Sequence, residues 1–276
     1  MRLVGEVTTR GEKSEECIHR FRTETRRADA ALRFFADCLP RRRTERIRRQ
    51  LSDIRGKAGL VRDFDILLPL LSEFGDQLPE LTVAWLLERV GRLRAEKMRS
   101  LKRFCQQLLK RDFKGQTQAL CHRIGWRPAE NAPSLPEYSS QSIDRLVTRF
   151  CNVVESIGDD EQQLHHARIL GRRLRYTLEL VKDNLPQGVV DDVCRDLSTL
   201  QDELGASNDQ VSVWQFLQTC EQECDQKSMA VSLRPIIDAL KVSMTEQANS
   251  AMQLVNDKAK SVRSRVAELT LACETH

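Results

Sequence analysis

One pattern of histidine and arginine occurs twice in the chain, as HRFRTETRRAD in residues 19–29 and as HHARILGRRLR in residues 165–175. The two copies lie 146 residues apart, and the same offset holds without a gap from residue 19 to residue 71. It aligns His19, Arg22, Arg26 and Arg27 with His165, Arg168, Arg172 and Arg173. Apolar and turn residues recur in any duplicated fold. Cations that recur in register indicate more than this, and we interpret them as a duplicated binding site for an anion.

The composition favours helices over strands. The 276 residues are 40% hydrophobic and 30% charged, with eight prolines and only 5% aromatic residues. Leu, Arg, Glu, Gln and Ala are good helix formers, whereas strands are rich in aromatic and β-branched residues. No region shows sustained alternation of polar and apolar residues, which strands require. We therefore expect an all-α fold, in a chain long enough for one large domain or two of ordinary size.

A proline-rich segment divides the chain where the repeat predicts a division. Residues 127–140 read RPAENAPSLPEYSS and form the predicted linker between a helical bundle in 1–126 and a second bundle in 141–276. Apolar periodicity predicts helices at 14–38, 41–57, 63–75, 79–111, 141–156, 160–183, 187–204, 208–224 and 228–268, the last either continuous or broken at Pro235. Short connections make neighbouring helices antiparallel, so we expect two antiparallel bundles from an internal duplication.

Each copy carries the same three residues at its predicted helix ends: a proline, a glycine and an aspartate. They are Pro40, Gly59 and Asp63 in the first copy and Pro186, Gly205 and Asp209 in the second. Proline is tolerated at the start of a helix, where its missing N–H costs nothing. Glycine is common just after a helix as a C-cap, and aspartate is a good N-cap. The sequence therefore predicts a helix break after each glycine and a new helix at each aspartate.

The cations of each copy share one face of a helix. At about 100° per residue, the cations of residues 165–175 occupy one side of the helix and the apolar residues the other. The opposing apolar sets are Ala167, Leu170, Leu174, Leu178 and Val181 in the second copy, and Cys17, Phe21, Ala28, Leu32 and Phe35 in the first. A merely solvated face usually mixes charges of both signs, but residues 165–175 contain no acidic residue. The arginine fork suits phosphate or carboxylate oxygens. The alternative is a solvated or salt-bridged face.

Charge is distributed unevenly along the chain. Residues 1–138 hold 29 Lys and Arg against 19 Asp and Glu, whereas residues 139–276 hold 15 against 21. A basic half indicates an anionic partner. The acidic half keeps its cations close together in residues 165–175, which makes the second copy the sharper signal.

Cysteine usage and hydropathy indicate a cytoplasmic protein without a metal site. The nine cysteines are scattered, odd in number and lack a CxxC pair, as expected of reduced thiols. No second pair of ligands stands at zinc spacing, so we predict neither a metal nor a cofactor. The N-terminal residues lack the apolar core of a signal peptide, and no segment approaches the roughly 18 consecutive apolar residues of a membrane span.

These motifs resemble those of the CHAD (histidine α-helical) domain family. The strongest match is LHHARILGRRLRYTLELV in residues 164–181, which contains HxxRxxxRRLR. A second signature resembles LSDIRGKAGLVRDFDILLPLL in 51–71 and LSTLQDELGASNDQVSVWQFL in 197–217, and the basic fourth helix resembles LLERVGRLRAEKMRSL in 86–101. Together they span roughly residues 14–265. The resemblance implies two bundles related by pseudo-twofold symmetry, with a basic pore or groove between them.

The resemblance also implies the ligand and its contacts. CHAD domains bind inorganic polyphosphate without cleaving it, and they associate with polyphosphate granules. The contacts carried over by position are His19, Arg22, Arg26 and Arg27, and His165, Arg168, Arg172, Arg173 and Arg175. Secondary contacts are Arg43, Arg46, Arg92 and Arg99 on the second and fourth helices. The first copy departs from the pattern because Asp29 stands where the second has Arg175, and because no counterpart of the helix at 141–156 precedes its motif.

Two other functions remain open from the residues. A phosphohydrolase acting on polyphosphate or nucleotides would need a metal, for which Asp63, Asp65 and Asp209 are the candidates. N-capping explains two of these aspartates more simply, and no P-loop is present. Nucleic-acid binding fits the charge, but the basic helices carry few aromatic residues for base stacking, Tyr176 being the candidate. For polyphosphate, contacts to His19 and His165 predict tighter binding in acid.

Overall fold

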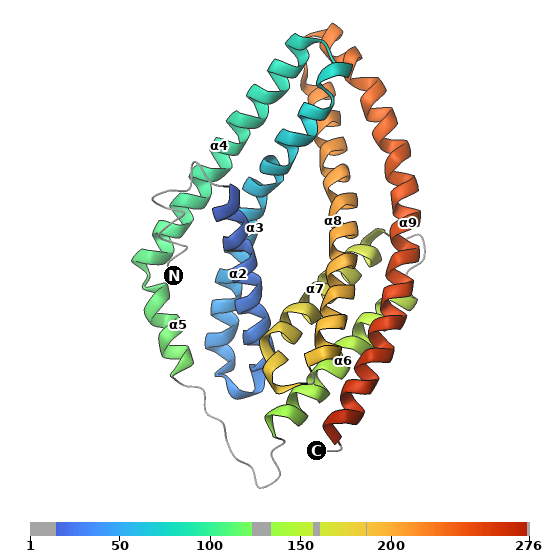
Figure 1. Cartoon of the computed structure of the whole chain (residues 1–276). Coiled ribbons are helices and arrows are strands. Elements are labelled where there is room, and N and C mark those ends of the chain that lie inside the picture. Colours follow the sequence, from blue (N-terminus) through green and yellow to red (C-terminus); the bar gives the residue numbers. More distant parts are fainter. Residues whose placement is uncertain (1–14, 123–133, 157–160, 186, 275–276) are drawn as a thin grey trace. The chain divides into compact units, whose positions relative to one another are not determined.

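The structure is a computed structural model that describes residues 15–122, 134–156, 161–185 and 187–274 (Figure 1). These residues form helices and no strands, which confirms the all-α prediction. The α-helices are α2 (Glu15–Phe34), α3 (Arg41–Glu73), α4 (Glu80–Lys110), α5 (Phe113–Cys121), α6 (Leu135–Glu155), α7 (Glu161–Val181), α8 (Gln187–Glu223) and α9 (Lys227–Glu274). Three short 3₁₀ turns are η1 (Ala36–Cys38), η2 (Gly75–Gln77) and η3 (Lys182–Asn184). None of the described helices is long and apolar enough to cross a membrane.

The order of elements repeats with the offset of the sequence. Helix α2 begins at Glu15 and α7 begins 146 residues later, at Glu161. The 3₁₀ turns η1 and η3 keep the same offset, and so do the first residues of α3 and α8. The sequence repeat therefore corresponds to a repeated helix–turn–helix unit. The predicted pair of bundles with a basic groove between them stays a prediction.

The sequence predicted a break in the helix that follows each motif helix, and this prediction is wrong. Helix α3 runs unbroken from 41 to 73 and α8 from 187 to 223, so Gly59 and Gly205 lie inside helices. Neither glycine has the positive φ of a C-cap. Glycine costs about 1 kcal/mol inside a helix, but next to Gly59 the helix buries Ala58 and Val61 completely. Burial of one such side chain contributes about as much or more, so the helix continues.

Asp63 and Asp209 also lie inside these helices, so N-capping does not explain them. Other boundaries differ as well. Helix α9 passes through Pro235 without a break, and α5 was not predicted. Helix α6 starts at Leu135, six residues earlier than predicted, because Ser134 and Glu137 form a capping box there. Pro186 and residues 127–133 of the predicted linker lie outside the described residues.

The chain packs as two compact units that alternate along the sequence. Unit 1 comprises the described parts of residues 1–26, 42–123 and 207–246, and unit 2 those of 27–41, 124–206 and 247–276. Helices α2, α8 and α9 each contribute to both units. The prediction of separate bundles in 1–126 and 141–276 remains a prediction.

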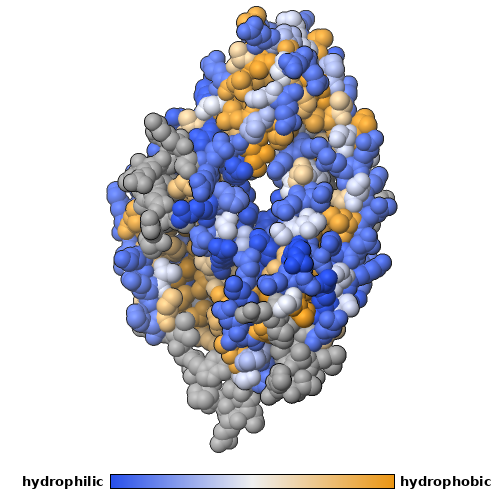
Figure 2. Space-filling model, viewed as in Figure 1, coloured by the Kyte–Doolittle hydropathy of each residue, from blue (hydrophilic) through white to orange (hydrophobic). Residues whose placement is uncertain are grey.

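Unit 1 is built around α3 and α4, which are antiparallel and are joined through η2 (Figure 1). Its core contains Leu71, Leu86 and Val90 from these helices together with Leu217 and Leu233 from α8 and α9. Half-buried aromatic residues border this core and include Phe64, Phe74, Trp85, Trp214 and Phe216. Figure 2 shows hydrophobic surface among hydrophilic residues at the η2 end of this unit.

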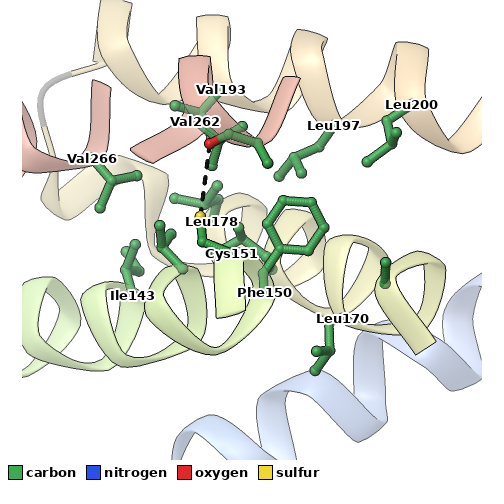
Figure 3. Packing of buried hydrophobic residues seen from close by; sticks show 14 of the residues in the cluster. Ile143, Phe150, Cys151, Leu170, Leu178, Val193, Leu197, Leu200, Val262 and Val266 are labelled. Atoms are coloured by element: carbon green, nitrogen blue, oxygen red, sulfur yellow. Dashed lines mark hydrogen bonds between the residues drawn. The ribbon is translucent and has the colours of Figure 1, made fainter. Parts of the chain in front are cut away.

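Unit 2 has its core between α6, α7, α8 and α9 (Figure 3). The ring of Phe150 is fully buried and faces Leu197 and Leu200 of α8 (Figure 3). Gly171 of α7 lets these helices approach, because a Cβ there would lie 3.4 Å from the Phe150 ring. The Cys151 thiol donates to the Ala259 carbonyl at 3.7 Å. Close packing thus holds α7, the helix of the second motif, in place.

Candidate anion-binding surfaces

The first motif lies on α2, with its cations on the solvent side. His19 is exposed, and Arg22 and Arg26 are half-buried. The buried side of α2 in unit 1 carries Ile18 and Phe21. Of the apolar stripe predicted for this copy, Phe21 alone is buried, whereas Cys17, Ala28, Leu32 and Phe35 are half-buried. Their partial exposure follows from α2 being shared between two units, so that no single core covers the whole stripe.

The Arg22 guanidinium reaches the neighbouring helix α3. Its Nη2 atom would lie 3.9 Å from a Cβ at Gly59. Arg55 of α3 fixes the same pair of helices by donating from Nη1 to the Thr25 carbonyl of α2 at 3.0 Å. Arg22 is therefore held against α3, with part of its surface still open to solvent.

Unit 1 surrounds His19 with positive charge. The pKa of His19 lies below its usual 6.5, first because nearby atoms remove part of its hydration and then because of the charges of Arg62, Arg26 and Arg22. Arg62 comes from α3 and also faces Glu15 at 3.8 Å. Repulsion among like charges on two adjacent helices is what an anion would relieve.

Two aspartates that are equivalent in the sequence repeat lie close enough in unit 1 for one to affect the pKa of the other. The pKa of Asp63 is raised, mainly by loss of hydration and further by the charges of Asp209 and Asp65, while Arg22 opposes the shift. Asp63 and Asp209 are 146 residues apart, so the repeat places the same residue of α3 and α8 in one neighbourhood. Within the described part of the chain, no three His, Cys, Asp or Glu side chains are grouped so that they could hold a metal.

Asp65 has a structural partner. Its carboxylate is completely buried and accepts a hydrogen bond from Arg94 Nε of α4 at 2.5 Å. Burial raises its pKa, and Arg94 opposes this shift. The pair joins α3 to α4, and the Asp65 carboxylate binds an arginine there.

The second motif lies on α7 in unit 2, and one contact of the first motif recurs in it. The predicted apolar stripe is confirmed, since Ala167, Leu170, Leu174, Leu178 and Val181 are all buried. His165 is exposed, and Arg168, Arg172 and Arg173 are half-buried. Arg168 Nη2 would lie 3.9 Å from a Cβ at Gly205, the same distance as between Arg22 and Gly59. At this arginine the recurrence in sequence is also a recurrence of side-chain placement.

Arg175 is neutralised by an acid on its own helix. Its Nη1 donates to Glu179 Oε1 at 2.6 Å, and its Nε donates to Gln201 Oε1 at 3.1 Å. The guanidinium carbon also lies 4.7 Å from the centroid of the Tyr176 ring. Tyr176 itself is buried, so it packs beneath Arg175 rather than presenting its face for base stacking.

The departure at Asp29 is one half of an exchanged ion pair. Asp29 accepts from Arg33 Nε at 2.9 Å, four residues along α2. The equivalents of Asp29 and Arg33 in the second copy are Arg175 and Glu179, so both copies form an i,i+4 pair with the charges reversed. Each copy thus has one arginine and one acid at these two positions, so the two positions have zero net charge in both copies.

The remaining sequence candidates lie on the outside of unit 1. Arg43 and Arg46 of α3 and Arg92 and Arg99 of α4 are exposed, which fits either weak anion contacts or solvation.

Arg27, the last cation of the first motif, is exposed and belongs to unit 2, where its Nη2 lies 3.5 Å from Glu179 Oε2. Residues that sequence reasoning missed are Arg62, Glu179 and Lys182; the exchanged pair at the 146-residue offset was the available signal for Glu179.

Comparison with known proteins relates the chain to one family. A family model described as the CHAD domain matches residues 4–218. The chain is also similar to a solved structure, the crystal structure of the CHAD domain from the plant Ricinus communis, with 21% sequence identity and a TM-score of 0.66. This match covers 96% of the chain and 86% of the plant chain, and at such identity it concerns the fold alone. No curated protein matches the chain.

Proposed function

The chain belongs to the CHAD domain family, and from this premise we propose that it binds inorganic polyphosphate without cleaving it. The observation that carries the proposal is the repeated cationic face of α2 and α7, with Arg22 and Arg168 at equal distances from Gly59 and Gly205. Guanidinium groups bind phosphate oxygens in pairs and keep their charge at physiological pH. A location on polyphosphate granules in the cytoplasm is part of the same proposal.

The contacts we propose are the two histidine and arginine clusters. Half-buried arginines on a helix face lose less side-chain entropy when they bind than arginines on a mobile loop, so they suit a repetitive polyanion. The proposed contacts are His19, Arg22, Arg26, Arg27, His165, Arg168, Arg172, Arg173 and Arg175, with secondary contacts from Arg43, Arg46, Arg92 and Arg99.

Competition binding tests the function. Labelled long-chain polyphosphate is bound to the full chain and displaced by unlabelled polyphosphate, DNA, RNA or tripolyphosphate at several salt concentrations. We expect polyphosphate to compete best at matched phosphate concentration and its affinity to fall steeply with salt, because binding releases counterions. Equal competition by DNA or RNA would replace the proposal with general polyanion or nucleic-acid binding. Release of phosphate with Mg²⁺ above the rate of a buffer control would replace it with hydrolysis.

The pKa of His19 predicts a pH dependence of this binding. In the free protein the pKa lies below 6.5, so the ring is mostly neutral at pH 7.5. A bound phosphate stabilises the charged ring and raises its pKa, so binding takes up a proton. Affinity should therefore increase as the pH falls through the raised pKa, and level off below the pKa of the free protein. Each unit of pKa difference corresponds to about tenfold in affinity.

Dissociation constants for polyphosphate at pH 8, 7, 6 and 5 in wild type and His19→Gln check this prediction. The variant keeps a polar side chain without a titrating ring, so it reports any titration of the ligand or of other groups. A wild-type pH profile that parallels that of the variant would remove His19 from the contacts.

A further inference from the structure

Glu179 of α7 lies between two cations of the proposed polyphosphate contacts. Its Oε1 atom accepts from Arg175 Nη1 at 2.6 Å, and its Oε2 atom lies 3.5 Å from Arg27 Nη2. The carboxylate thus presents one oxygen to each guanidinium, as a phosphate group would. The Glu179 side chain is 29% exposed and that of Arg27 is 53% exposed.

A pocket of about 420 Å³ opens beside this carboxylate. Arg27, Tyr176, Glu179, Leu180 and Lys182 line it, all within unit 2. Lys182 stands in η3, just after α7, and adds a third cation around Glu179. The charged residues that line the pocket are therefore two cations, Arg27 and Lys182, and one acid, Glu179. The same acid pairs with Arg175.

We propose that Glu179 is an internal competitor that occupies a phosphate subsite formed by Arg27, Arg175 and Lys182, and that a phosphate group of the bound polymer displaces it. The proposal rests on the polyphosphate-binding function proposed above. The pair with Arg27 is exposed, and the pair with Arg175 is an i,i+4 pair on one helix that is only part-buried. Ion pairs of these kinds contribute little to stability, so the carboxylate can rotate away at low cost when a group of higher charge arrives. The displaced carboxylate nevertheless stays close to the phosphate and repels it. Glu179 therefore weakens binding and makes it easier to reverse.

The test compares the full-length wild type with Glu179→Gln, using long-chain inorganic polyphosphate as the probe. Glutamine keeps the size and removes the charge, so it cannot compete for the guanidinium groups as an anion. Losing an exposed pair of this kind corresponds to about two- to fivefold in affinity, and we expect tighter binding by that factor. The gain should shrink as salt rises. The gain from Glu179→Gln should also be smaller when it is measured in the Lys182→Gln background than in wild type, because the freed subsite has then lost one cation.

Glu155→Gln is the matched control. Glu155 pairs with Arg263 at 2.6 Å in the same unit, and neither residue lines the pocket. The control changes net charge by the same amount and also removes one exposed ion pair. Equal gains in Glu179→Gln and Glu155→Gln would show a general charge effect and overturn the inference. Weaker binding by Glu179→Gln would overturn it too, because Glu179 would then hold the arginines in place for the ligand.

The proposed function and the inference fail in different ways. Binding by wild type without a specific gain in Glu179→Gln rejects the competitor and leaves the function intact. Absence of binding by both proteins rejects the function, and the inference falls with it. Binding by Glu179→Gln alone supports the competitor and shows that the wild-type site is closed by its own acid. Thermal unfolding of each variant verifies that all are folded at the temperature of the measurement.

Discussion

Replacing Arg22 and Arg168 together by glutamine should weaken polyphosphate binding by about a hundredfold or more. These arginines are equivalent in the two copies, are half-buried, and each lies beside a glycine of the next helix at the same distance. A hydrogen bond to a charged group contributes about 1.5–3 kcal/mol, and each 1.4 kcal/mol is tenfold in affinity. Two such contacts therefore give at least two orders of magnitude if they act independently.

The salt dependence provides a second reading of the same variant. For a single-stranded polyanion, each neutralised phosphate contributes about 0.7 to the slope of log affinity against log salt. Loss of two contacts should reduce the slope by about 1.4. Titrations with polyphosphate at four salt concentrations measure both the affinity and the slope.

The control removes two arginines outside the motif. Arg195 and Arg234 have side chains that are 74% and 68% exposed, and each pairs with an acid. The Arg195→Gln/Arg234→Gln protein loses the same net charge, and its affinity should change by only a few fold. If both double variants lose affinity equally, binding follows net charge and the motif arginines have no special role.

Arg94→Met should destabilise unit 1 by about 3–5 kcal/mol at pH 7, the cost of removing one partner from a buried ion pair. The Asp65 side chain has no solvent-exposed surface, and among the described residues its Oδ2 atom has no hydrogen-bond partner. Without Arg94 its charge would be buried with no compensation. Urea unfolding followed by tryptophan fluorescence measures the loss, because Trp85 and Trp214 both lie beside the core of unit 1.

The loss in Arg94→Met should diminish in acid. Burial already raises the pKa of Asp65, and removal of Arg94 raises it further because the arginine opposes that shift. A carboxyl whose pKa is higher in the folded than in the unfolded state binds its proton more tightly when folded. The destabilisation is therefore complete above the folded pKa and decreases as the pH falls through it. A loss that is independent of pH between 7 and 4 would contradict this account.

A second substitution separates the buried charge from lost packing. Asp65→Leu in the Arg94→Met background removes both charges, and replacement of a buried ion pair by apolar residues is often neutral or stabilising. We expect the double variant to recover most of the stability at pH 7. Failure to recover would indicate that the two side chains fill space that Met and Leu cannot fill.

Much of the local structure followed from residue order. The 146-residue offset predicted the repeated helix pair, and the apolar spacing from Ala167 to Val181 predicted the buried side of α7. Both depend on helical geometry, in which residues three or four apart share a face. The same local rules failed at Gly59 and Gly205, where they favoured a break. Propensity is a weak term. Burial of Ala58 and Val61 outweighs it at Gly59, and Leu204 is buried next to Gly205.

The partners of the charged residues could not be predicted in this way. The i,i+4 pairs Asp29–Arg33 and Arg175–Glu179 follow from helical spacing, but the contact of Glu179 with Arg27, 152 residues earlier, does not. Asp65 was a candidate metal ligand in the sequence, and α4 supplies Arg94 to it from 29 residues away. Contacts between helices depend on their packing, which no short window of sequence contains.

The sequence alone thus specified an all-α chain in which a cationic helix face occurs twice, because periodicity and repetition are properties of the linear chain. Packing in three dimensions decided which of those charges are balanced across helices: Glu179 of α7 lies next to Arg27 of α2, and α4 brings Arg94 to Asp65. The physical reason is that the energy of a charge depends on its distance to other charges and on its exposure to water. Both quantities exist only once helices far apart in sequence have come together.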